Sequence, residues 1–191
     1  ENHDFGIDIY ENPADGTSNF SHVTPNSDTK GLPTTATTGD YMVLGDYDDD
    51  GDIDILGRKE NGFDLWTNSG SGTYLVNNSI NETTSNSNKG GVLFCDFDND
   101  GDFDIYWTDG GTNQIWEQTG INSGNFSATG EPAASSGIGI SGTIDGCSCG
   151  DVDNDGDIDL FLGGSSGANS YLFLNNGTGF NFTLNNMGIN P

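Results

Sequence analysis

Three short segments of the chain place aspartates at alternate positions around a glycine. They read GDYDDDGDIDILG from Gly45, CDFDNDGDFDIYW from Cys95 and GDVDNDGDIDLFL from Gly150, and they align without gaps. Counted from the first aspartate of each loop, carboxylates occupy positions 1, 3, 5 and 9, and glycine occupies position 6. Alternate residues of a tightly curled loop point their side chains at one centre, and glycine permits the turn that brings the later ligands round. The three loops are therefore candidate cation sites.

The donor set predicts calcium. Calcium takes six to eight oxygen ligands, whereas zinc and copper favour nitrogen and sulfur. Magnesium fits less well because it prefers a smaller octahedral shell with several waters kept. Position 7 would offer its main-chain carbonyl, with its own carboxylate pointing outward. The predicted metal-site residues are Asp46, Asp48, Asp50, Asp52 and Asp54 in the first loop, Asp96, Asp98, Asp100, Asp102 and Asp104 in the second, and Asp151, Asp153, Asp155, Asp157 and Asp159 in the third.

The charge of the chain supports this interpretation. It has 30 acidic residues against 4 basic ones, a formal net charge of −26. Without a cation, each close pair of carboxylates repels by about 4 kcal/mol at an effective dielectric near 20. A single such segment is also compatible with an Asp/Gly-rich surface turn, but three aligned copies favour filled sites. The same charge excludes nucleic acid and anionic membranes as expected partners, since both need Lys/Arg patches.

Short apolar segments flank the loops and predict strands. One precedes each loop, at Tyr41–Leu44, Val92–Phe94 and Ile144–Cys149, and one closes it, at Ile53–Leu56, Phe103–Trp107 and Ile158–Leu162. A third strand is predicted at Phe63–Asn68, Asn113–Gln118 and Tyr171–Asn176, and an aromatic residue opens a fourth at Tyr74, Phe126 and Phe180. Alternating residues with glycine nearby support strands rather than helices. An EF-hand is excluded, because its flanking helices and its Glu at position 12 are both missing.

The repeat defines the expected architecture, an all-β chain of four-stranded antiparallel units. The loops begin 50 and 55 residues apart, at Asp46, Asp96 and Asp151, a spacing that suits four strands. Ile7–Asn12 aligns with the third strand of a unit and Phe20 with the aromatic of the fourth. We therefore expect a single repeat domain over 1–191, with a half unit at 1–37 and full units at about 38–87, 88–140 and 141–191.

The repeats resemble the FG-GAP/VCBS repeats of integrin-α-type β-propellers. The resemblance rests on the strand ending in Gly-Asp, the Asp-x-Asp-x-Asp-Gly-x-x-Asp loop and a strand such as Ile-Asp-Ile-Leu-Gly. It implies propeller blades, calcium between the first and second strands, a location outside the cell, and a role in adhesion, assembly or accessory binding. The three full units lack the Phe-Gly and Gly-Ala-Pro signatures of the integrin repeat, so the VCBS type is closer.

About three and a half blades do not close a propeller, which usually takes four to eight. The chain is then an excerpt of a longer propeller, or another copy completes the half blade. An open strand edge promotes association, so a homo-oligomer or a filament is expected in the second case.

The leading function predicted is a secreted structural or adhesion module that binds a protein or a glycan, without catalysis. The alternative is an accessory carbohydrate- or protein-binding domain, or a fragment, of a larger secreted enzyme. Trp66, Trp107 and Trp116 are candidates for stacking on sugars, although blade packing is the simpler role for Trp66 and Trp116. His3 and His22 are expected to be surface residues.

Other features limit the cellular setting. No apolar run approaches the roughly 18–20 residues that span a membrane, so no membrane insertion is expected. Cys95, Cys147 and Cys149 cannot all pair within one chain, and buried thiols with at most one disulfide are expected. Sequons for N-glycosylation occur at Asn19, Asn77, Asn81, Asn125, Asn176 and Asn181.

Overall fold

The computed structural model describes residues 9–11, 21–23, 32, 38–59, 62–80, 90–108, 113–129, 138, 140, 144–165 and 167–185. All regular structure in these residues is β, which confirms the all-β prediction. Within the same residues, no helix has the length and apolar character needed to cross a membrane.

Three four-stranded antiparallel sheets follow one another along the chain, with the strands of each in sequence order. Blade 1 contains β3 (Thr38–Gly45), β4 (Asp54–Lys59), β5 (Gly62–Asn68) and β6 (Tyr74–Val76). Blade 2 contains β7 (Val92–Cys95), β8 (Asp104–Thr108), β9 (Asn113–Gln118) and β10 (Phe126–Ala128). Blade 3 contains β11 (Ile144–Gly150), β12 (Asp159–Gly164), β13 (Tyr171–Asn175) and β14 (Phe182–Asn185). A two-stranded sheet, β1 (Ile9–Glu11) with β2 (Ser21–Val23), precedes them and corresponds to the expected half blade.

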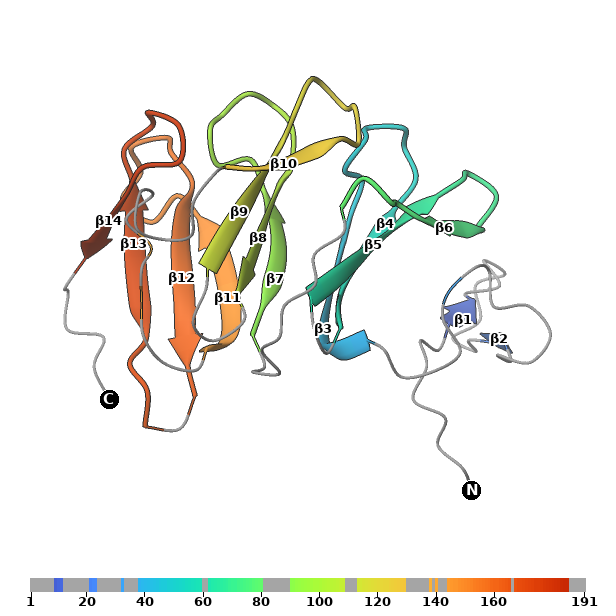
Figure 1. The fold of residues 1–191 in the computed structure, drawn as a ribbon, viewed down its shortest axis with the longest axis horizontal. Coiled ribbons are helices and arrows are strands. Elements are labelled where there is room, and N and C mark those ends of the chain that lie inside the picture. The colour runs from blue at the N-terminus through green and yellow to red at the C-terminus, as the bar shows by residue number, and fades with distance from the viewer. Residues whose placement is uncertain are drawn as a thin grey trace.

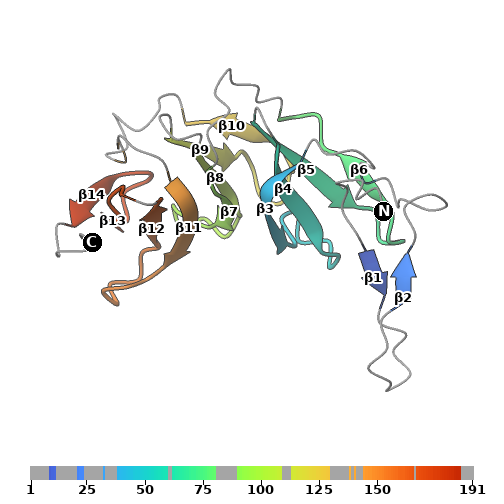
Figure 2. The ribbon, with the colours of Figure 1, turned by 90° about the horizontal axis from the view of Figure 1, so that it is seen from below.

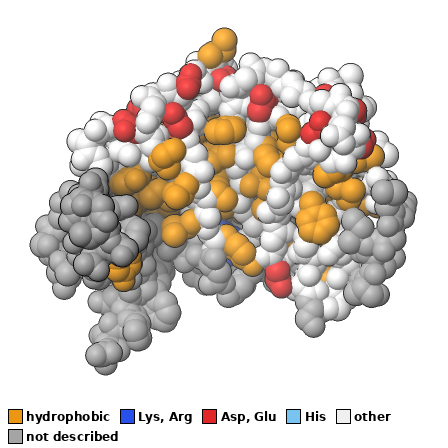
Figure 3. Space-filling model, turned by 180° about the vertical axis from the view of Figure 1, so that it is seen from behind, with side chains coloured by type: hydrophobic (Ala, Val, Ile, Leu, Met, Phe, Trp, Pro, Cys, Tyr) orange, Lys and Arg blue, Asp and Glu red, His pale blue; other side chains and the backbone are white. Residues whose placement is uncertain are grey.

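The blades fan out side by side as in part of a propeller (Figures 1 and 2). The first strand of each blade lies innermost, and β7 contacts both β3 and β11. The three Asp loops connect the first and second strands and lie along one edge of the fan, at the top of Figure 1. Acidic side chains gather along that edge, above a largely apolar face (Figure 3). The described sheets do not close into a ring.

Alternation along the strands places an apolar layer on each side of blade 2. Ile105 and Trp107 of β8 face blade 1 and pack with Leu56 of that blade. Tyr106, between them in the sequence, faces blade 3 and packs with Leu160. Because successive strand residues point to opposite faces, one strand contributes to two cores. The thin, repeated cores explain how a chain with only 31% hydrophobic residues can fold.

The tryptophans belong to these cores. Trp66 is 1% exposed and Trp107 is fully buried, so the prediction that they are exposed platforms for sugars is wrong. Trp116 is partly buried and meets Phe63 edge-on, with ring centroids 6.2 Å apart. The simpler prediction of blade packing is confirmed for Trp66 and Trp116.

Two details of blade 3 differ from the sequence alignment. The residue equivalent to Asn68 and Gln118 is Asn175, one residue earlier than the alignment placed it. The fourth strand opens at Phe182 rather than Phe180, because residues 176–181 form the turn between β13 and β14. A shift of one residue in a strand exchanges its two faces, so buried contacts decide this register.

The blade boundaries at 88 and 141 lie outside the described residues, as do Ile7, Phe20 and His3. For His22 the structure describes only the backbone. The domain limits therefore stay a prediction.

One disulfide joins two blades. Cys95 at the end of β7 pairs with Cys149 of β11, and Cys147 is a free thiol. Burial raises the pKa of Cys147 to about 12, which keeps the thiol protonated at neutral pH. The bridge crosslinks the innermost strands of blades 2 and 3, directly before their Asp loops.

Candidate metal centres

The three Asp loops adopt one backbone conformation. We call residues 46–54, 96–104 and 151–159 loops 1, 2 and 3. Position 4 is left-handed in each, with φ of 54° at Asp49, 60° at Asn99 and 61° at Asn154. Position 6 is left-handed too, with φ of 93° at Gly51, 96° at Gly101 and 98° at Gly156. Aspartate, asparagine and glycine are the residues that tolerate this conformation, so local sequence is sufficient to curl the loop.

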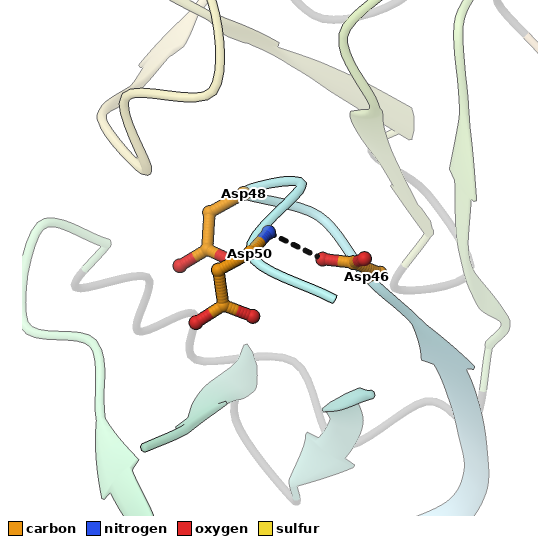
Figure 4. Close-up of side chains that lie close together, drawn as sticks. All are labelled: Asp46, Asp48 and Asp50. Atoms are coloured by element: carbon orange, nitrogen blue, oxygen red, sulfur yellow. Dashed lines mark hydrogen bonds between the residues drawn. The ribbon is translucent and has the colours of Figure 1, made fainter. Parts of the chain in front are cut away.

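The aspartate at position 1 holds the curl together. In loop 1, Asp46 Oδ1 accepts the N–H of Asp50 at 3.1 Å, and Asp46 Oδ2 accepts the N–H of Gly51 at 3.0 Å. Loops 2 and 3 repeat both bonds from Asp96 and Asp151. Figure 4 shows the first of these bonds and the side chains of Asp46, Asp48 and Asp50 around it.

In each loop, carboxylate oxygens converge. One oxygen from each of three aspartates lies within 4.8 Å of the other two, a spacing that could hold a metal ion. The three sets are Asp46, Asp48 and Asp50; Asp96, Asp98 and Asp104; and Asp151, Asp153 and Asp159. Positions 1 and 3 therefore take part in every loop, joined by position 5 in loop 1 and by position 9 in loops 2 and 3.

The electrostatics of these sets favour a cation. Burial raises the pKa of Asp48, and the neighbouring Asp50 and Asp46 raise it further. The pKa of Asp98 is raised for the same reasons, burial first and Asp100 second. Within the described chain, Asp48 Oδ1 is buried without a hydrogen-bond partner. Burying a carboxylate oxygen without a partner is costly, and a bound divalent cation would offset that cost.

The aspartate at position 9 has a second role that the spacing alone does not reveal. Asp104 is 1% exposed; its Oδ2 accepts the N–H of Phe97 at 3.0 Å and its Oδ1 accepts the N–H of Gln118 at 3.1 Å. Asp54 and Asp159 make the same pair of bonds in their blades. Position 9 thus ties the loop to the end of the third strand. Desolvation raises the pKa of Asp104 to about 8 and that of Asp54 to about 6, against the lowering effect of these N–H groups.

The carboxylates at position 7 lie outside the converging sets. Asp102 Oδ1 accepts the N–H of Asn122 in the turn between β9 and β10, at 3.0 Å. A Cβ added at Gly70 would lie 2.8 Å from Asp52 Oδ2, and Asp157 lies against Gly177 in the same way. These side chains therefore pack on the turn that precedes the fourth strand, and none belongs to the converging sets of the described loops. Their expected part in a metal site is the main-chain carbonyl.

The structure also adds residues that the motif did not include. Gln118 and Asn175 end the third strands and reach into the preceding blade, while Asn99 and Asn122 join neighbouring loops. The only sequence signal was an amide residue at the end of each aligned third strand, which by itself predicts no contact.

Comparison with known proteins agrees with this geometry. The model of the FG-GAP-like repeat family matches residues 46–107 and 96–162, which together span more than half of the 191 residues. The chain belongs to the FG-GAP-like repeat family. Both matches begin at the first aspartate of a loop, so the family match includes the candidate metal centres. Among curated proteins there is no match.

A solved structure shares the fold. It is an Agrocybe aegerita lectin described in terms of specific recognition of non-reducing terminal N-acetylglucosamine. The TM-score is 0.58 at 18% sequence identity, with 95% of this chain and 47% of the lectin chain covered. The chain thus spans about half the length of this structural neighbour, and at this identity the likeness shows the fold alone.

Proposed function

We propose that this chain is a secreted structural and adhesion module that carries one calcium ion in each of its three loops and catalyses no reaction. The observation that supports this most directly is the convergence of carboxylate oxygens in all three loops. Membership of the FG-GAP-like repeat family supports it as well. Bound calcium would neutralise the clustered charge and crosslink each loop.

The residues present fit calcium. Side chains at positions 1, 3 and 5 and the carbonyl at position 7 supply oxygens from one curled loop. Position 9 can contribute although its oxygens accept N–H groups, because each carboxylate oxygen has more than one acceptor site. In loop 1 the fit is supported most directly by Asp48 Oδ1, which is buried and accepts no hydrogen bond.

Calorimetric titration of the metal-free chain with calcium tests the proposal. We expect three ions per chain, and two for the Asp48→Ala variant. Asp52→Ala is the matched control in the same loop, since its carboxylate lies against Gly70 and the variant keeps its main-chain carbonyl. Absence of binding at millimolar calcium would refute the proposal.

The second candidate is an accessory carbohydrate- or protein-binding domain of a larger secreted protein, an enzyme included. The fold shared with the Agrocybe aegerita lectin favours it. A glycan array probed with the calcium-loaded chain separates the two candidates. Binding to a defined terminal sugar supports the accessory role, whereas an array without binding favours the structural and adhesion module.

An extracellular location is part of the proposal. The disulfide between Cys95 and Cys149 supports it, because disulfides persist in oxidising compartments. Of the described sequons, Asn77 is the least suited to carry a glycan. Its side-chain amide donates to Tyr47 Oη and to the Gly124 carbonyl, both at 3.0 Å.

Self-association is also proposed, through blade 3 rather than through the half blade. Val152, at position 2 of loop 3, is 53% exposed, and Phe161 of β12 is 37% exposed. Their equivalents in blades 1 and 2 are buried by the following blade, namely Tyr47 at 3%, Phe97 at 0%, Leu56 at 0% and Tyr106 at 0%. This face is therefore suited to another blade, supplied by a second copy. Sedimentation of the wild type and of Val152→Lys tests it, and a monomeric wild type at high concentration contradicts it.

A further inference from the structure

A buried series of hydrogen bonds links the three Asp loops. Its first part lies within each blade. The carboxylate at position 9 accepts the N–H of position 2 in its own loop and the N–H of the last residue of the third strand. In blade 2 these partners are Phe97 and Gln118 around Asp104. In blade 3 they are Val152 and Asn175 around Asp159, at 2.8 and 2.9 Å.

Its second part crosses from blade to blade. Gln118 Nε2 donates to the main-chain carbonyl of Tyr47, position 2 of loop 1, at 3.2 Å. Asn175 Nδ2 donates to the carbonyl of Phe97, position 2 of loop 2, at 2.7 Å. The same residue that binds position 9 of its own loop through its backbone thus binds position 2 of the preceding loop through its side chain.

Together these bonds form one continuous path. It runs through Asp54, Tyr47, Gln118, Asp104, Phe97, Asn175 and Asp159. Tyr47, Gln118, Phe97 and Asn175 are each 3% exposed or less. Water therefore competes little for these bonds, which hold the loops and strand ends in fixed positions relative to one another.

A second set of contacts follows the rim. Asn122 Nδ2 donates to Asp49 Oδ2 of loop 1 at 3.3 Å, while its backbone N–H binds Asp102 of loop 2. Asn99 Nδ2 of loop 2 donates to Asp157 Oδ1 of loop 3 at 2.9 Å. Adjacent loops are thus joined both in the core and at the edge.

We propose that the three loops bind calcium as energetically coupled sites, and that Gln118 and Asn175 are the positioning residues that couple them. The inference rests on the calcium binding proposed above. An ion that fixes the carboxylate at position 9 also fixes the strand end bonded to it, and through the side-chain amide the loop of the preceding blade. Each ion thus holds the neighbouring loop in its binding conformation, and because coupling is reciprocal the gain in affinity is equal in both directions.

The coupling ends at loop 3. Position 2 of this loop is the half-exposed Val152, and no described blade follows it. Among the described strands, loops 1 and 2 are braced by a following blade and loop 3 is not. Loop 3 is therefore the weakest of the three sites in the isolated chain.

The test follows each loop separately. The backbone amides of Gly51, Gly101 and Gly156 report loops 1, 2 and 3 in an NMR titration with calcium. Asp48→Ala is expected to abolish the response of Gly51 and to raise the calcium concentration at the Gly101 midpoint about five-fold, at the lower end of typical couplings. Gln118→Met keeps the length of the side chain but lacks the amide, which donates to the Tyr47 carbonyl and accepts the N–H of Gly124. In this background only the rim contact through Asn122 still joins loops 1 and 2, so Asp48→Ala is expected to shift the Gly101 midpoint by much less than five-fold.

Asn68→Met is the matched control. Asn68 occupies the same position in blade 1, but its side-chain amide donates to the Ile53 carbonyl within its own blade, so the coupling of loops 1 and 2 should persist. If Gln118→Met does not fold, Asn175→Met with Asp98→Ala tests the step between loops 2 and 3.

The outcomes are distinct. Equal Gly101 midpoints with and without Asp48→Ala in the wild-type background would overturn the coupling while leaving calcium binding intact. A Gly101 shift of undiminished size in Gln118→Met would overturn the path through Gln118. A chain whose three glycine amides all ignore calcium would overturn the proposed function itself.

Discussion

Replacing Asp104 by asparagine should destabilise the chain in calcium and much less without it. Asp104 is 1% exposed, and its two carboxylate oxygens accept the N–H groups of Phe97 and Gln118. Asparagine keeps one acceptor and turns an NH₂ group toward the other donor. The loss of one hydrogen bond to a charged group, with a buried N–H left unpaired, costs about 3 kcal/mol.

The calcium-free chain is expected to respond differently. Because desolvation raises the pKa of Asp104 to about 8, the carboxyl is largely protonated at pH 7 without a cation. A protonated carboxyl resembles asparagine in having one unprotonated oxygen, so the substitution should then cost less than about 1 kcal/mol. In calcium the carboxylate is ionised, so Asp104→Asn should lower the free energy of unfolding by the full amount.

The measurement is thermal unfolding, followed by tryptophan fluorescence, in calcium and in chelator. For a chain of this size about 3 kcal/mol corresponds to a fall in Tm of roughly 6–12 °C. Asp102→Asn is the control in the same loop, since the Asp102 side chain binds Asn122 outside the converging set. Its effect should be the same in both conditions. An equal loss of stability for Asp104→Asn in calcium and in chelator would refute the reasoning.

Further predictions concern the loops and the crosslink. Asp98→Ala should lower Tm in calcium but change it little in chelator, where the substitution also relieves repulsion between Asp98 and Asp100. Equal changes in Tm in the two conditions would contradict this. In chelator, the raised pKa values of Asp54 and Asp104 mean that the folded chain holds protons that the unfolded chain releases above about pH 4. These two carboxyls therefore stabilise the folded chain below about pH 4, and their contribution is lost by about pH 8. The Tm of the metal-free chain should fall from pH 5 to 8, and a rise would disprove this prediction. Cys95→Ser removes a disulfide between residues 54 apart and should lower the free energy of unfolding by up to about 4 kcal/mol. Cys147→Ser, the control, should lower it less. Both are measured by unfolding in urea, and adding reductant should remove the difference between wild type and Cys95→Ser.

The local chemistry could be predicted from the residues alone. Calcium loops take their ligands from one short segment, so the spacing of Asp46, Asp48 and Asp50 around Gly51 already implies converging oxygens, and the structure brings these carboxylates together. Period-two apolar segments on both sides of each loop predicted strands, and repetition predicted the four-stranded blades. All of these depend on contacts within about one blade.

Contacts between blades were decided only by the tertiary structure. Gln118 lies 71 residues from Tyr47 in the sequence and Asn175 lies 78 residues from Phe97, and nothing in the spacing identifies either pair. The pairing of Cys95 with Cys149 rather than Cys147, the burial of Trp107 and the register of β13 are likewise set by how one sheet packs on the next. The sequence alone determines which atoms can bind a cation, because those atoms share one loop. Whether the loops act together is determined by packing, because their links join segments that only the folded chain brings together.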